Sequence, residues 1–175
     1  MSWFCIKCCD CFLLTLLIFF CAIVITYPYP WHASCKVKWE LPHFPCSLVK
    51  TKLLQQIDEW QGEENCKIGT PEINEKCLYS LASNTDIEVR AVHETPVKRY
   101  KDDLSFTLQD DNDQGCLVYG YSTSRLWYAH LDYSTNYCNL FNLVEGAGLV
   151  ETLGYLESTS DKICTQYSSR NCSRF

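Results

Sequence analysis

The stretch 102–124, DDLSFTLQDDNDQGCLVYGYSTS, decides the fold that we expect for this chain. Its first part places apolar Leu104, Phe106 and Leu108 at every second position, which is typical of a strand with one buried face. The polar run 110–115 predicts a turn, and a second apolar segment follows it directly. The stretch therefore predicts a β-hairpin.

Segments on both sides extend this pattern. CKVKWELP (35–42) and DIEVRAVHET (86–95) also alternate apolar and polar residues, so each predicts a strand. CSLVKTKLLQQIDEWQG (46–62) has apolar residues at spacings of three and four, which predicts a helix. A second helix is expected from Ser134 to Glu145, with Ser134 or Thr135 as its N-cap.

The order strand, helix, three strands, helix predicts the fold class. Consecutive antiparallel strands with helices on one face form an α+β sandwich. We assign this domain to residues 30–175, which are enough to bury a moderate core.

Cysteine usage points to an oxidising compartment. Of thirteen cysteines, five lie in or beside the N-terminal apolar run and eight lie downstream. The downstream eight are widely spaced and form no C-x-x-C pair, which favours four disulfides over a zinc site. The full connectivity does not follow from the sequence. Loop geometry favours Cys35 with Cys46 and Cys66 with Cys77. The eight disulfide candidates are Cys35, Cys46, Cys66, Cys77, Cys116, Cys138, Cys164 and Cys172.

The N-terminal segment carries the most apolar run of the chain. Residues 12–26 hold no charge, and as a helix they would cover about 22 Å. Counting from Trp3 to Tyr27 gives about 37 Å, enough to span a bilayer with some tilt. Aromatic residues flank the run at both ends, as in membrane interfaces. We expect a transmembrane helix at 12–29, a short cytosolic segment at 1–11 and a single-pass anchor whose C-terminal domain is extracellular or lumenal.

A cleaved signal peptide is the alternative to an anchor. The best cut, after Ala33, would place the large Trp31 at the third position before the cleaved bond, where a small residue is needed. The anchor is therefore preferred. Cleavage would release a secreted domain from the same compartment.

Two kinds of modification are expected. Reduced thiols beside a membrane accept palmitoyl groups, and the candidates are Cys5, Cys8, Cys9 and Cys11. Tolerated apolar residues or a metal site remain alternatives for this group. Asn171 begins the glycosylation sequon NCS, although a disulfide at Cys172 would hinder its modification.

Few residues suggest chemistry. The net charge of -6 and the scattered basic residues exclude a nucleic-acid footprint. His93 and His130 lack the spacing of a metal site, and no cofactor motif is present. Asp102 and Asp103 point to opposite faces of a strand, so they cannot act as a pair on one substrate.

The segment after the hairpin holds the candidate binding residues. The aromatic side chains in RLWYAHLDY form either a layer of the core or an exposed recognition surface. The candidates are Arg125, Trp127, Tyr128, His130 and Tyr133.

Two segments resemble a known family. ETPVKRYKDDLSFTL (94–108) and YGYSTSRLWYAHLDYSTNYCNL (119–140) resemble a small α/β domain of unknown function found in bacteria and plastids. The whole chain resembles uncharacterised vertebrate proteins with a short membrane segment and a Cys-rich outer domain. Neither resemblance implies a reaction. The residues that match the bacterial and plastid domain are Thr95, Pro96, Asp102, Asp103, Ser122, Ser124, Arg125 and Asn136.

The sequence thus predicts a membrane-anchored extracellular or lumenal domain that binds a protein or lipid ligand and catalyses nothing. One alternative is a secreted ligand that is released by signal cleavage. The other is a hydrolase that uses Asp103, His130 or Ser124, although no G-x-S-x-G elbow surrounds the serine.

Overall fold

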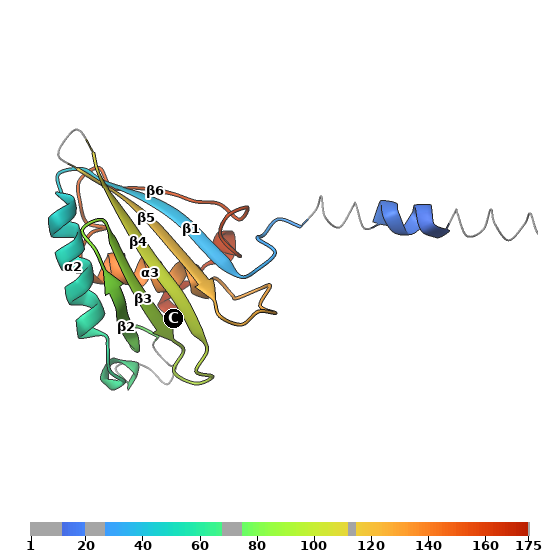
Figure 1. Cartoon of the computed structure of the whole chain (residues 1–175), viewed down its shortest axis with the longest axis horizontal. Coiled ribbons are helices and arrows are strands. Elements are labelled where there is room, and N and C mark those ends of the chain that lie inside the picture. The colour runs from blue at the N-terminus through green and yellow to red at the C-terminus, as the bar shows by residue number, and fades with distance from the viewer. Residues whose placement is uncertain (1–11, 20–26, 68–74, 112–114, 175) are drawn as a thin grey trace, which may run out of the picture.

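The computed structural model describes residues 12–19, 27–67, 75–111 and 115–174 (Figure 1). The domain is α+β, and its six-stranded antiparallel sheet has the order β2-β3-β4-β5-β1-β6. The elements are β1 (Ser34–Leu41), α2 (Cys46–Glu59), the 3-10 turn η1 (Glu64–Lys67), β2 (Tyr79–Asn84), β3 (Glu88–Glu94), β4 (Lys101–Asp110), β5 (Cys116–Ser124), α3 (Thr135–Gly146), β6 (Leu156–Ser158) and the 3-10 turns η2 (Tyr167–Ser169) and η3 (Cys172–Arg174).

The predicted hairpin is confirmed as β4 and β5. Phe106 lies opposite Gly120 in this pair, and β1 adds to the other edge of β5, so that Val37 also faces Gly120. The buried ring of Trp39 covers the glycine, and a Cβ there would come within 2.6 Å of the ring. The Trp39 ring, the largest buried side chain, therefore fits against the sheet because residue 120 has no side chain.

Both predicted helices pack on the same face of the sheet. The inner face carries the alternating apolar residues of β1, β3, β4 and β5, and α2 and α3 cover it and contact each other (Figure 1). The outer face carries residues such as Lys38, Arg90 and Asp103. The largest fully buried apolar side chains are Trp39, Tyr79, Phe106, Leu41, Leu53, Ile57, Leu140, Leu143 and Leu149.

The predicted strand order omitted two edge strands. In β2 only Tyr79 is buried and the next five residues are exposed, so the strand has no alternating pattern. The other omission, β6, is three residues long. Each of these strands is held by backbone pairing to one neighbouring strand, and its side chains follow no pattern that predicts a strand.

Four disulfides staple the domain, and the prediction that eight cysteines pair is confirmed. The local bridge Cys66–Cys77 is as expected, but the predicted bridge between Cys35 and Cys46 is wrong. Cys35 pairs with Cys164, and Cys46 pairs with Cys116. Cys35 lies near the start of β1 and Cys46 follows the end of this strand. Because the strand is extended, it holds these two cysteines apart. The fourth bridge is Cys138–Cys172.

The N-terminal segment is described in part. Residues 12–19 are helical, whereas 27–29, the last part of the predicted transmembrane helix, are not. No helix within the described ranges combines the length and the apolar character that crossing a bilayer requires. The palmitoylation candidates Cys5, Cys8, Cys9 and Cys11 lie outside the described residues.

Candidate functional site

A cavity of 470 Å³ opens at the end of the sheet where β5 finishes and α3 begins. Its walls come from the β3–β4 loop, the segment between β5 and α3, and the chain before β2. The polar lining residues are Glu75, Thr95, Lys98, Asp102, Ser124, Asp132, Thr135 and Asn136. The apolar and aromatic lining residues are Val97, Tyr100, Leu126, Ala129, Leu131 and Tyr133.

Asp102 occupies the inner wall of this cavity. As the second residue of β4 it points to the helix side of the sheet, where it is 4% exposed. Its Oδ2 accepts a hydrogen bond of 2.8 Å from Asn139 Nδ2 on α3. Burial raises its pKa to about 6, although hydrogen bonds from Asn139 and Ser124 oppose the rise. At neutral pH this carboxyl is therefore mostly ionised, and it takes up a proton as the pH falls through about 6.

Glu75 lies beside Asp102 in the cavity lining. Burial, reinforced by the negative charge of Asp102, raises the pKa of Glu75 to about 7. Its Oε2 is buried without a hydrogen-bond partner among the described residues. A buried carboxylate oxygen without a donor is costly, so the site holds an acceptor that a ligand's donor would satisfy.

His93 is fully buried and contacts the main chain of Glu75. Its Nε2 donates to the Glu75 carbonyl oxygen over 3.0 Å, and its ring packs against Tyr79 with 4.4 Å between centroids. Burial lowers its pKa to about 4, so the ring is neutral. Nδ1, the acceptor nitrogen of this tautomer, has no hydrogen bond within the described part of the chain. His93 thus fixes the Glu75 backbone without adding a positive charge.

A stripe of asparagines on α3 lies beside the site, and one of them, Asn136, lines the cavity. Asn136, Asn139 and Asn142 recur every third residue, and all three are buried against the sheet. Asn136 Oδ1 accepts from Ser122 Oγ over 2.6 Å, and the Asn139 carbonyl accepts from Tyr79 over 3.1 Å. The stripe is not among the predicted site residues, although its spacing of three within an apolar helix is visible in the sequence.

Asp132 caps α3 at the same site. Its carboxylate accepts hydrogen bonds from the backbone N–H groups of Ser134 and Asn136 and from Asn136 Nδ2. The predicted cap residue Ser134 makes no side-chain cap. Its φ of 71° is left-handed, and its hydroxyl donates to the Gln166 carbonyl oxygen instead.

The segment before α3 is strained and held by the C-terminal tail. Tyr133 and Ser134 both have positive φ angles, which non-glycine residues rarely adopt. Gln166 Oε1 accepts from the N–H groups of Asp132 and Tyr133 at 3.0 Å and 2.8 Å. Strain of this kind concentrates at binding sites, where the surrounding structure imposes it.

The predicted binding residues divide between two environments. Arg125 pairs with Asp103 on the outer face of the sheet, as a structural salt bridge would. Trp127, Tyr128 and Tyr133 are 85%, 55% and 75% exposed, so they form a surface and not a core layer. Tyr133 also lines the cavity.

The three residues of the hydrolase alternative, Asp103, His130 and Ser124, do not lie together in one site. Asp103 lies on the sheet face opposite the cavity, and the ring of His130 is exposed and bonds to the Trp31 carbonyl. Ser124 does line the cavity, beside Asp102. The described residues contain no group of three or more histidine, cysteine or acidic side chains arranged to hold a metal ion.

A larger, shallower depression of 780 Å³ lies over the outer side of α3. Its central carboxylate, Glu157, accepts hydrogen bonds from Trp39, Tyr137, Tyr155 and Tyr167. Because so many donors already satisfy this group, we assign it the role of anchoring β6 and the tail. The sequon residue Asn171 is exposed at the margin of this depression.

The cavity lining includes Thr95, Asp102, Ser124 and Asn136, four of the residues on which the expected resemblance to a bacterial and plastid domain rests. Comparison of the chain with family models, curated proteins and solved structures finds no match. The functional assignment therefore rests on the geometry of this site.

Proposed function

We propose that the chain is a membrane-anchored extracellular or lumenal domain that binds a small amphiphile in the 470 Å³ cavity and catalyses no reaction. The four disulfides support an oxidising compartment. The uncharged run 12–26, together with the aromatic flanks that extend it from Trp3 to Tyr27, supports an anchor. The cavity volume is in the range of small-molecule sites.

The cavity lining favours a ligand with an apolar body and a cationic head, such as a single-chain amine. Leu126, Leu131 and Tyr133 would contact the apolar body. Asp102 and Glu75 would accept hydrogen bonds from the head. The observation that carries this proposal is the buried Oε2 of Glu75, a residue of the cavity lining, which has no hydrogen-bond partner among the described residues.

A ligand with an anionic head fits the cavity less well. A carboxylate or phosphate head would meet three acidic side chains, whereas the basic lining residue Lys98 is exposed and lies over the Tyr100 ring. Like charges placed together in a partly buried site repel strongly. A fatty acid of the same chain length is therefore a matched negative control.

Photolabelling of the full chain in nanodiscs tests the proposal. A photoreactive single-chain amine should label the peptides that contain 95–100 and 126–136, and the corresponding fatty acid and N-acetylated amine should not. Asp102→Asn should abolish the labelling, while Asp103→Asn, the adjacent carboxyl on the outer face, should preserve it. Equal labelling by all three probes would reject the amine specificity.

A specific observation favours a second candidate, a hydrolytic enzyme. Glu75 and Asp102 have pKa values raised to about 7 and about 6, which suits general acid–base chemistry near neutral pH. Ser124 donates a hydrogen bond to Asp102. Release of product from an amide or ester of an amphiphilic amine, lost in Asp102→Asn, would support this reading over simple binding.

A further inference from the structure

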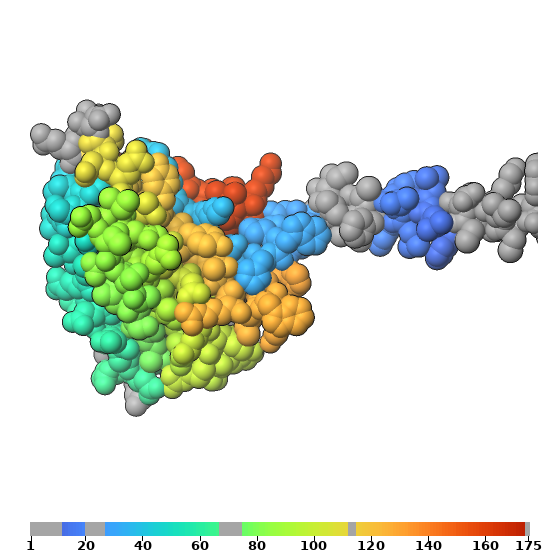
Figure 2. Space-filling view, viewed as in Figure 1, coloured from blue at the N-terminus to red at the C-terminus, as the bar shows by residue number. Residues whose placement is uncertain are grey.

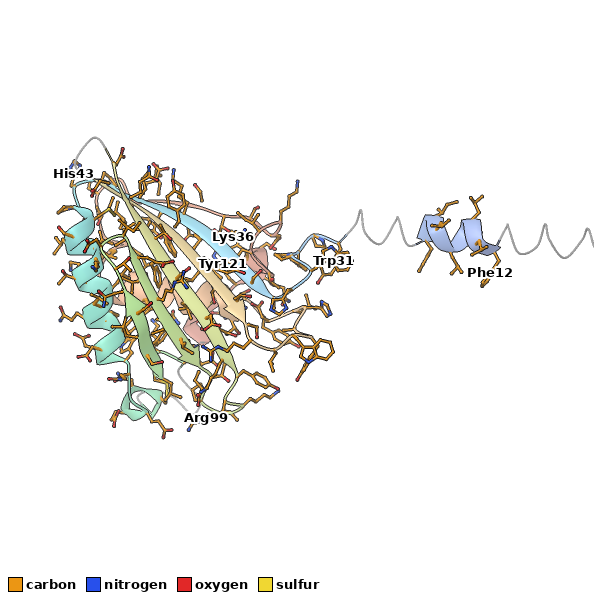
Figure 3. The ribbon with its side chains drawn as sticks, viewed as in Figure 1. Phe12, Trp31, Lys36, His43, Arg99 and Tyr121 are labelled. Carbon is orange, nitrogen blue, oxygen red and sulfur yellow. A yellow bond between two sulfur atoms is a disulfide. The ribbon has the colours of Figure 1, made fainter. Side chains whose placement is uncertain are left out.

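Exposed aromatic and apolar side chains gather at the end of the domain where the N-terminal chain enters. We define the stem-end surface as Trp31, Trp127, Tyr128, Leu131 and Tyr133, which are between 53% and 85% exposed. Figure 2 shows the segment after Tyr27 and the orange loop that follows β5 side by side at this end. Figure 3 places Trp31 there, far from His43 at the other end of the sheet.

Hydrogen bonds join the entering chain firmly to the loop. Ala33 N–H donates to the Ala129 carbonyl over 2.8 Å, and the ring of His32 bonds to the Ser124 carbonyl over 2.8 Å. The His130 ring bonds to the Trp31 carbonyl in turn. These hydrogen bonds hold the loop against the chain that follows the apolar run.

Chain length then fixes how far this surface can lie from the apolar run. Trp31 is five residues after Thr26, and an extended chain covers at most about 3.5 Å per residue, so the distance is at most about 18 Å. Tyr27, the first residue after the run, stacks on Trp31 with 5.2 Å between ring centroids, which shortens the reach further. If the run lies in a bilayer, the stem-end surface meets its headgroup layer.

We infer that the stem-end surface docks on the outer leaflet of the bilayer that holds the N-terminal run, so that the cavity opens toward lipid. Tryptophan and tyrosine prefer the membrane interface, where the ring is partly apolar and its polar group remains hydrated. Leu131 and Tyr133 belong both to this surface and to the cavity lining. An amphiphile could therefore pass from the leaflet into the cavity without crossing water. The inference rests on the anchoring part of the proposed function.

Photocrosslinking of the full chain in cell membranes tests this inference. A photoreactive phenylalanine analogue replaces Trp127 in one variant and Leu153 in the control. Leu153 is 84% exposed, and its neighbour Gly154 packs against Pro42, beyond the far end of β1. That strand spans about 23 Å. Phospholipid adducts are expected at position 127 and only background is expected at position 153.

Other outcomes overturn the inference. Equal lipid adducts at both positions, or adducts at position 127 with a second copy or with another protein, would show that the surface does not face the leaflet. Carbonate extraction of the same membranes separates the two proposals. A chain that remains in the pellet without lipid adducts at position 127 rejects only the docking, whereas a chain released by carbonate rejects the anchor and the docking with it.

Discussion

Asp102 and Asp103 are neighbours in β4 whose carboxyl groups lie on opposite faces of the sheet. Asp102 is buried in the cavity and accepts a hydrogen bond from Asn139. Asp103 is exposed and forms a bidentate pair with Arg125. Because the two differ in environment but not in chemistry, each is the natural control for the other.

Asp102→Asn should stabilise the protein at neutral pH. The pKa of Asp102 is raised in the folded state, so the unfolded chain loses this proton first as pH rises, and stability falls as pH climbs toward about 6. Each unit of that difference costs about 1.4 kcal/mol. Chemical denaturation should show the variant to be more stable than wild type by roughly 1–3 kcal/mol at pH 7.5, with little difference at pH 3.5.

Asp103→Asn serves as the control for this measurement. It removes an exposed ion pair, so its effect should stay within about 0.5 kcal/mol at either pH. A destabilising effect of Asp102→Asn at pH 7.5 would show that its carboxylate is more stable in the fold than we infer.

Glu75→Gln should flatten the same pH dependence. Burial and the Asp102 charge raise the pKa of Glu75 to about 7, so wild-type stability should continue to fall between pH 5 and pH 7. Removing the titratable group removes that contribution. Unfolding free energies at half-unit pH steps would check this, and an unchanged slope would contradict it.

Loss of the longest disulfide should cost more than loss of the shortest. Cys35–Cys164 closes a separation of 129 residues, and Cys66–Cys77 closes 11. The loop-entropy relation predicts a difference of about 2 kcal/mol between the two double Cys→Ala variants. Denaturant midpoints measured with the other three bridges intact would test it, and equal losses would show that chain entropy is not the main source of their stabilisation.

Gly120→Ala should destabilise the sheet. A Cβ at this position would lie 2.6 Å from the Trp39 ring and 3.1 Å from Val37, both on the adjacent strand. Overpacking of a tight core costs roughly 1–3 kcal/mol. The thermal midpoint should fall, and Trp39 fluorescence should shift as its ring moves. An unchanged midpoint would mean that the ring repacks freely.

Regular alternation explains which parts of the fold could be predicted. The hairpin 102–124 and the strand at 86–95 each bury every second side chain, so periodicity found them. The strand β2 buries only its first residue, and long-range disulfides depend on the folded topology. Neither leaves a local signal in the chain.

The candidate site was largely beyond sequence reasoning. Glu75 lies in a polar loop whose burial depends on the tertiary structure, so nothing in its neighbours marked it. The asparagine stripe at 136, 139 and 142 did leave a signal, which was masked by the apolar residues between its members. The aromatic loop was recognised, but only the structure showed that its side chains are exposed.

The affinity of a water-soluble amine for the cavity tests the central claim most directly. Titration of octylamine into nanodiscs that hold the full chain, at pH 7.5 and corrected for empty nanodiscs, gives a dissociation constant for wild type, Asp102→Asn and Asp103→Asn. Loss of a charge-assisted hydrogen bond should weaken binding to Asp102→Asn by about ten-fold or more and leave Asp103→Asn unchanged. Identical constants for all three proteins, or no binding above the empty nanodiscs, would contradict the account.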